Sequence, residues 1–132
     1  MRLTWPNCLN VRDLGGLPTT DGGQIGAGAL IRSDNLSRLT EAGVRAVRRA
    51  DVSRIIDVRT PEECKGDPSP FATEPVYWNI PLYNDDDPYD PALSIDQQYA
   101  AMLDLHPELF ASAVGAFADA PTGAVVVHCH AG

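Results

Sequence analysis

A short apolar run and a reactive turn meet in the sequence Ala124-Val125-Val126-Val127-His128-Cys129-His130-Ala131-Gly132. The three consecutive valines are β-branched and favour a buried strand. His128 and Cys129 follow at once, and Ala131-Gly132 forms a small turn. Because ligands bind beyond the carboxyl ends of parallel strands, this pattern predicts a functional site where the strand ends.

The rest of the chain alternates short apolar strands with helical patterns. We expect strands near residues 23–25 and 29–32, paired as a hairpin, and at 53–59, 76–80 and 124–128; a helical turn at 61–65; and helices at 40–49, 94–103 and 107–118. Such alternation predicts an α/β fold with a mainly parallel central sheet flanked by helices. One domain over residues 1–132 accounts for the whole pattern.

Length, composition and charge narrow the class of protein. The chain has 132 residues, of which 44% are hydrophobic and 21% charged, which suits a soluble domain with a single core. A formal net charge of −8 argues against nucleic-acid binding and against adhesion to anionic membranes. We find no signal peptide and no segment near the roughly 18 apolar residues of a membrane span. We therefore expect a cytoplasmic protein.

The three cysteines, Cys8, Cys64 and Cys129, are odd in number and have no motif spacing, so a disulfide framework or a zinc site is not expected. We expect no metal and no cofactor. A reducing compartment also suits a nucleophilic thiol. Cys129 is the strongest candidate, because a cysteine between a strand and a glycine-containing turn is typical of loops in which a thiolate attacks phosphorus and backbone N–H groups hold the phosphoryl oxygens. The alternative is a buried structural cysteine.

Four ordered blocks carry a resemblance to a known family. They are Asn10-Val11-Arg12-Asp13-Leu14-Gly15-Gly16, then Gly28-Ala29-Leu30-Ile31-Arg32-Ser33-Asp34-Asn35-Leu36, then Ile56-Asp57-Val58-Arg59 with Glu63, and finally Val127-His128-Cys129-His130-Ala131-Gly132. Together they resemble the bacterial and fungal tyrosine phosphatase family, also called protein tyrosine/serine phosphatases. In that family the last block continues through Lys, Asp, Arg, Thr and Gly. Only three residues follow Cys129 here, so the arginine that would clamp the phosphoryl oxygens is absent.

The resemblance implies a single, C-terminally incomplete, cysteine-phosphatase-like domain over residues 1–132, with the C-terminal helices missing. It implies a protein tyrosine phosphatase, with dual specificity as an open possibility, acting on a phosphorylated protein or a small phosphate monoester. Cys129 would be the nucleophile that forms a phosphocysteine, and the N–H groups of His130, Ala131 and Gly132 would begin the phosphate cradle. We expect turnover by this chain to be absent or very weak, because one lost transition-state donor typically costs about 2.7 to 4 kcal/mol.

The general acid is open between two places. The resemblance allows an aspartate in the part of the loop that is absent here. It also allows an aspartate on a separate loop, as in related cysteine phosphatases, and Asp85, Asp86 and Asp87 occupy such a loop after the predicted strand at 76–80. We favour Asp85 of these three. The alternative is that all three face solvent as an ordinary acidic turn.

Several charged residues in the matching blocks are candidate supporting groups. His128 would order the loop through a ring hydrogen bond, and Asp57 stands at the second strand end that carries reactive side chains. Arg12 with Asp13, Arg32 with Asp34, and Arg59 with Glu63 form possible charge pairs. Each arginine would either approach the phosphate or tie loops together. We place Arg12, Asp13 and Arg32 among the supporting residues and Arg59 in the substrate-binding group.

Two rival interpretations remain at this point. The segments Ile55–Glu63 and Asn79–Leu82 also resemble the opening of a rhodanese-type sulfurtransferase domain, although the fifty or so residues before Ile55 have no place in a minimal domain of that kind. The other rival is a non-catalytic phosphate-binding fragment. Thiosulfate with cyanide and an aryl phosphate would separate the two enzyme classes.

Overall fold

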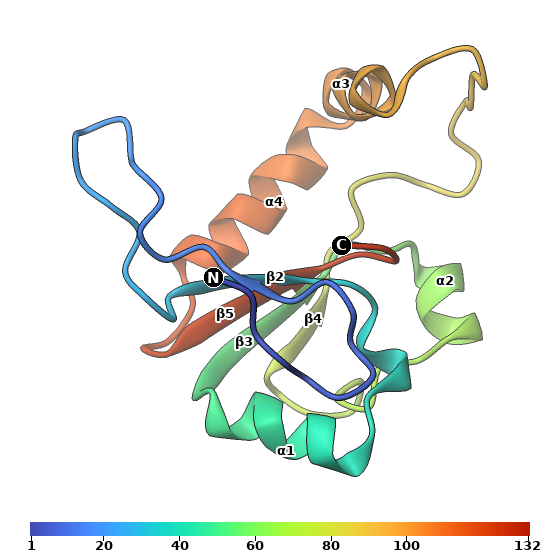
Figure 1. Ribbon diagram of the computed structural model, residues 1–132. Coiled ribbons are helices and arrows are strands. Elements are labelled where there is room, and N and C mark those ends of the chain that lie inside the picture. Colours follow the sequence, from blue (N-terminus) through green and yellow to red (C-terminus); the bar gives the residue numbers. More distant parts are fainter.

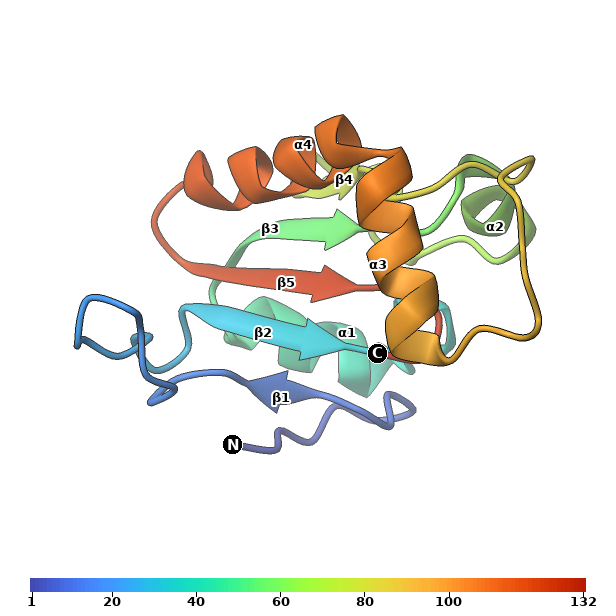
Figure 2. The ribbon, with the colours of Figure 1, turned by 90° about the horizontal axis from the view of Figure 1, so that it is seen from above.

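The computed structural model describes residues 1–132 as an α/β structure around one five-stranded sheet (Figure 1). The strands are β1 (Arg12–Asp13), β2 (Leu30–Ser33), β3 (Val52–Asp57), β4 (Tyr77–Asn79) and β5 (Ala124–His128). Their order across the sheet is β1-β2-β5-β3-β4, as Figure 2 shows from above. Only the β1–β2 pair is antiparallel, so the prediction of a mainly parallel sheet is confirmed.

Helices cover both faces of the sheet. They are a 3-10 turn at Leu36–Arg38, α1 (Glu41–Arg49), α2 (Pro61–Gly66), α3 (Ile95–Leu105) and α4 (Pro107–Ala118). In Figure 1, α1 lies on one face and α3 and α4 on the opposite face, while α2 lies beyond the ends of the strands. The predicted flanking helices are therefore confirmed. No helix combines the length and the apolar character needed to cross a lipid bilayer.

The helices adjoining the strand ends begin at residues with favourable caps. The Thr40 side chain accepts a hydrogen bond from the Gly43 N–H at the start of α1. Thr60 and Glu63 form a reciprocal capping box at the start of α2, where Pro61 occupies the first turn. These local signals fix where α1 and α2 begin, which in turn fixes the loops that leave β2 and β3.

The core has two sides because alternate residues of a strand face opposite faces of the sheet. Ile55 and Val126 belong to the larger cluster, which also contains Val47 of α1. Ile56 and Val125 belong to the smaller cluster with Ala116 of α4. The central strand β5 is thus buried on both faces, which explains its uninterrupted apolar run.

The predicted hairpin between residues 23–25 and 29–32 is wrong. The strand β2 is present, but its antiparallel neighbour is β1, with Arg12 opposite Arg32 and Asp13 opposite Ile31. Residues 16–25 instead form a separate small loop, closed by an isolated bridge between Pro18 and Gln24.

Asp13 explains this pairing. One oxygen of its carboxylate accepts from the Gly15 N–H at 2.8 Å and the other accepts from the Gly28 N–H at 2.9 Å. The carboxylate thereby joins the two ends of the loop and holds β1 beside β2. The contact between Asp13 and Gly28 spans fifteen residues. The turn-forming residues between them therefore indicated a loop, but they did not indicate which two strands the loop joins.

Candidate functional site

Two strand ends meet at the carboxyl edge of the sheet. Asp57, the last residue of β3, is the register partner of His128, the last residue of β5. The pairing of the two segments extends one residue beyond β3, because the Val58 N–H donates to the His128 carbonyl at 3.0 Å. The predicted meeting of the Asp57 and His128 strand ends is confirmed.

The turn after β5 curls over the sulfur of Cys129. The Gly132 N–H lies 3.3 Å from Cys129 Sγ and points to it. Gly132 has a φ of +88°, a conformation that favours glycine. The turn thus directs a backbone N–H at the sulfur of a half-buried cysteine.

Side chains from the N-terminal blocks brace this turn. Asn10 donates from Nδ2 to the carbonyl oxygens of Ala131 at 3.2 Å and of Gly132 at 3.3 Å. Arg32 donates to the same Gly132 oxygen at 3.1 Å. Arg32 therefore contacts the turn directly, which agrees with a supporting role. Sequence analysis placed Asn10 in a matching block but did not single it out.

A second set of contacts fixes the segment that carries Asn10. Asp34 accepts from the N–H groups of Leu9 and Asn10, each at 2.9 Å, and from the Cys8 thiol at 2.8 Å. Burial, and then the neighbouring Asp34 carboxylate, raise the pKa of Cys8 above its ordinary range. Cys8 is consequently a protonated structural thiol. The suggested charge pair of Asp34 with Arg32 is absent.

The buried end of β3 is organised around Asp57, whose side chain is fully buried. Arg59 donates to it from Nε at 3.0 Å and from Nη2 at 2.8 Å, and Tyr77 donates from its hydroxyl at 2.6 Å. Burial opposes ionisation of Asp57, but the hydrogen bonds from Arg59 and its other partners lower the net pKa of the carboxyl. Asp57 is therefore a buried carboxylate compensated mainly by Arg59.

Arg59 is committed to this buried cluster. Its side chain is only 2% exposed, and Nη1 donates to the Asp67 carbonyl at 2.9 Å. The suggested charge pair of Arg59 with Glu63 is replaced by the pair with Asp57, and Glu63 instead accepts from the Tyr83 hydroxyl and the Thr60 N–H. Arg59 lines the cavity described below, yet its donors are directed to Asp57 and Asp67.

His128 lies between the buried cluster and the turn. Its Nδ1 is 3.0 Å from the Cys129 carbonyl oxygen, so the predicted ring hydrogen bond is present, with Nδ1–H as donor. Its Nε2 is 3.5 Å from an Asp57 oxygen and has no hydrogen-bond partner. Burial lowers the pKa of His128 despite the opposing effect of Asp57. His128 is thus neutral at pH 7.

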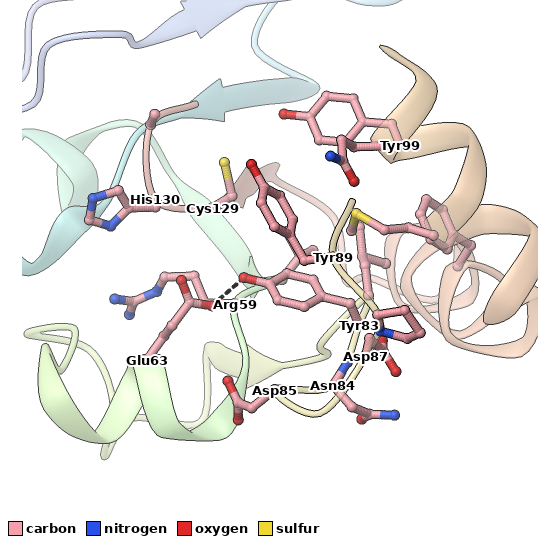
Figure 3. A pocket seen from close by; sticks show the side chains of 17 residues that line it. Arg59, Glu63, Tyr83, Asn84, Asp85, Asp87, Tyr89, Tyr99, Cys129 and His130 are labelled. Atoms are coloured by element: carbon pink, nitrogen blue, oxygen red, sulfur yellow. Dashed lines mark hydrogen bonds between the residues drawn. The ribbon is translucent and has the colours of Figure 1, made fainter. Parts of the chain in front are cut away.

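Cys129 opens onto a cavity of about 700 Å³. Seventeen residues line it: Val58, Arg59, Glu63, Leu82, Tyr83, Asn84, Asp85, Asp87, Pro88, Tyr89, Gln98, Tyr99, Met102, Phe110, Cys129, His130 and Ala131. Figure 3 shows the turn at Cys129 on one side, α3 with Tyr99 on another, and the loop with Tyr83 and Tyr89 between them. The cavity therefore combines the sulfur of Cys129 with aromatic walls.

The acidic loop reaches the cavity with two of its three aspartates. Asp85 accepts from the Thr60 hydroxyl at 2.7 Å, which ties the loop to the start of α2. Asp87 accepts from His106 Nε2 at 2.7 Å, and a backbone hydrogen bond from Asn84 is the main cause that lowers the pKa of Asp87. Asp86 does not line the cavity. The structure thus brings Asp85, the favoured aspartate, to the same cavity as Cys129.

Aromatic residues of the wall were not singled out from the sequence. Tyr83 donates to Glu63 at 2.7 Å, as the dashed line in Figure 3 marks, and burial together with this carboxylate raises the pKa of Tyr83. Tyr89 and Tyr99 also line the cavity; their hydroxyls form no hydrogen bond with the protein, and both residues are largely exposed. No feature of the sequence around these tyrosines distinguishes them from ordinary surface tyrosines.

The remaining supporting candidates lie outside the cavity. Arg12 donates from Nε to the Asn10 side-chain oxygen at 3.2 Å, so it orients the residue that braces the turn. Asp13 stabilises the loop before β2, as described above, and forms no ion pair with Arg12. No group of three or more His, Cys, Asp or Glu side chains has an arrangement suited to a metal ion.

Comparison with known proteins identifies the family of the chain. A family model described as "Tyrosine phosphatase family" matches residues 3–132. No curated protein matches the chain significantly. The family match includes the segment before Ile55 that a minimal sulfurtransferase domain would not explain, and it supports phosphatase function, with phosphorylated substrates, in general. The chain therefore belongs to the tyrosine phosphatase family.

Proposed function

We propose that the cavity binds phosphate monoesters and that Cys129 is the nucleophile of a cysteine-dependent tyrosine phosphatase. The observation that carries this proposal is the Gly132 N–H directed at Cys129 Sγ at the end of β5, inside an open cavity. The thiolate would attack phosphorus, so that an S–P bond forms while the bond to the phenol oxygen breaks. Water would then cleave the S–P bond and release inorganic phosphate and the thiolate.

The backbone N–H groups of the turn are the proposed cradle. Those of His130 and Ala131 would join the Gly132 N–H around the phosphoryl oxygens, as donors that need no rearrangement during the reaction. Asn10 supports this role because it donates to the Ala131 carbonyl, which belongs to the same peptide group as the Gly132 N–H. Asn10 and Arg32 also hold the Gly132 carbonyl at the end of the turn.

Asp85 is the proposed general acid. It lines the cavity that Cys129 enters, and its hydrogen bond from the buried Thr60 hydroxyl keeps the carboxyl at the cavity edge. A protonated Asp85 would give its proton to the leaving phenolate, and the carboxylate would later accept a proton from the attacking water. Thr60 would act as a positioning residue.

Arg59 is assigned to the support of Asp57 and not to the clamping of phosphate. Its guanidinium donates to Asp57 and to the Asp67 carbonyl, so no free guanidinium remains among the lining residues. Loss of one transition-state donor typically reduces the rate by about a hundredfold or more. We therefore propose that this chain forms the phosphocysteine slowly and that its multiple turnover is very weak.

The walls of the cavity favour an aromatic substrate. Tyr83, Tyr89 and Tyr99 lie around the entrance to Cys129 (Figure 3). Aromatic pairs of this kind contribute roughly 0.5–1.5 kcal/mol beyond buried area. The proposed order of preference is phosphotyrosine above phosphoserine and phosphothreonine, which supports tyrosine specificity over dual specificity.

Covalent trapping tests the proposal. The chain is incubated with an aryl phosphate, quenched in acid and mapped by mass spectrometry for a phosphoryl group on Cys129. Cys129→Ser should lose the adduct, and Cys64→Ser, as the matched control, should keep it. Release of thiocyanate from thiosulfate and cyanide without any adduct would instead favour the sulfurtransferase interpretation. Saturable phosphate binding without any adduct would favour a non-catalytic phosphate-binding fragment.

A further inference from the structure

The charges of the chain are divided unevenly along the sequence. All ten Lys and Arg residues lie within residues 1–65, whereas residues 66–132 contain ten Asp and Glu residues and no Lys or Arg. This second half supplies the loop with Asp85 and Asp87 and the helices α3 and α4, which form most of the cavity wall. The wall is therefore built from a segment without any permanent positive charge.

The lining of the cavity has the same imbalance. Glu63, Asp85 and Asp87 contribute three carboxylates, and Arg59 is the one permanent cation. Arg59 is already compensated by the buried Asp57. Hydrogen bonds, foremost that from Tyr83, lower the pKa of Glu63 in spite of burial. A substrate that enters the cavity thus meets a negative field outside the turn at Cys129.

Aromatic faces complete this arrangement. The side chains of Tyr89 and Tyr99 line the cavity while the residues remain 77% and 60% exposed, so their rings are accessible from solvent. A Lys or Arg side chain over such a ring gains about 0.5–1 kcal/mol at an exposed site. Carboxylates and tyrosine faces together form a surface that attracts cations.

We propose that the cavity selects phosphotyrosine residues whose neighbours in the peptide are Lys or Arg, and that it disfavours acidic neighbours. This inference rests on the proposed function of the Cys129 turn. The phosphate would contact the backbone N–H groups of that turn, and the flanking cations would contact Glu63, Asp87, Tyr89 and Tyr99. The cations would also offset the repulsion between the phosphate and the carboxylates of the wall.

Protection of Cys129 from alkylation tests the inference without any need for turnover. Iodoacetamide, an uncharged reagent, is added together with one of two phosphotyrosine peptides that differ only in Lys or Glu neighbours. Peptide mapping separates modification of Cys129 from that of Cys8 and Cys64. The Lys peptide should protect at a concentration at least about fivefold lower, the effect of one unit charge pair near 4 Å in water. High salt should narrow this difference.

Matched variants locate the effect. Glu63→Gln keeps an oxygen that can cap α2 and removes one charge from the cavity, so the preference for the Lys peptide should fall. Glu62→Gln removes a charge from the same helical turn outside the lining and should leave the preference unchanged. Tyr99→Leu should weaken protection by the Lys peptide, whereas Tyr99→Phe retains the ring face and should not.

The results of these experiments separate failure of the peptide preference from failure of the proposed function. Equal protection by the two peptides, or better protection by the Glu peptide, overturns the inference and leaves the proposed function intact. Protection of Cys129 by phenyl phosphate but by neither peptide would also overturn the inference and leave the proposed function intact. Equal loss of preference in Glu62→Gln and Glu63→Gln also overturns it, because the effect would then be a general field. If phenyl phosphate and both peptides fail to protect, the proposed function is overturned together with the inference.

Discussion

The floor and the wall of the cavity are stabilised in different ways. We call floor the polar cluster beneath the cavity, of which only Arg59 belongs to the cavity lining. It consists of Asp57, Arg59 and His128, which are buried, and Tyr77 of β4, which is partly buried. The wall, residues 83–102, contains no buried residue and is attached mainly through polar contacts. We therefore propose that the floor sets the position of Cys129, whereas the wall sets substrate preference.

The strongest test of this contrast is Asp57→Ala. The change leaves the guanidinium of Arg59 buried without its carboxylate, and breaking a buried pair typically costs about 3–5 kcal/mol. We expect a loss of that size in the free energy of unfolding measured with urea. Asp86→Ala, on the wall and outside the cavity lining, is the control and should change it by less than about 0.5 kcal/mol. Similar losses of unfolding free energy in Asp57→Ala and Asp86→Ala would contradict the distinction between floor and wall.

The pH dependence of stability tests the floor through His128. Its pKa in the folded chain is lowered by burial, so below an ordinary value of about 6.5 the unfolded chain binds more protons than the folded one. Stability should therefore fall as pH falls through this range, by up to about 1.4 kcal/mol per pH unit. Urea unfolding between pH 7 and pH 5 measures this slope. His128→Gln should flatten it and the exposed His130→Gln should not; an unchanged slope in His128→Gln would contradict the assignment.

Thr60→Ala tests the junction between floor and wall. The side chain caps α2 and donates to Asp85, so its removal should cost about 1 kcal/mol of unfolding free energy and release the acidic loop. Ser94 caps α3 through the same kind of box. Ser94→Ala should lose a similar amount of stability while keeping the rate of Cys129 phosphorylation by an aryl phosphate. Of these two variants, only Thr60→Ala should show slower phosphorylation of Cys129.

The smallest expected effect on stability is that of His106→Gln on the wall. His106 contacts Asp87 at 2.7 Å and joins the acidic loop to the start of α4. A partly exposed pair contributes less than about 1 kcal/mol, so global unfolding should change little. Limited proteolysis within residues 88–94 should nevertheless become faster, because the loop loses an attachment. Unchanged proteolysis would show that other contacts hold the wall.

Local sequence signals were sufficient where a residue's partners lie near it in the chain. The run of valines before His128 specified β5, and the helical patterns at 40–49 and 107–118 specified α1 and α4. The hairpin failed because Asp13 joins β1 to β2 across an intervening loop. The suggested pair of Arg59 with Glu63 failed for a different reason. Asp57 is even nearer to Arg59 in the chain, and both residues are buried at the end of β3, where they pair.

The amino-acid sequence on its own established the parallel strand that leads into Cys129, the ordered blocks of the phosphatase family and the negative net charge. These properties depend on adjacent residues or on composition. Assembly of the sheet decided that Asn10 braces Ala131, 121 residues away along the chain, and that Asp85 and Tyr99 share a cavity with Cys129. Those contacts join segments that come together only when β2, β3 and β5 align their carboxyl ends, so no local pattern encodes them.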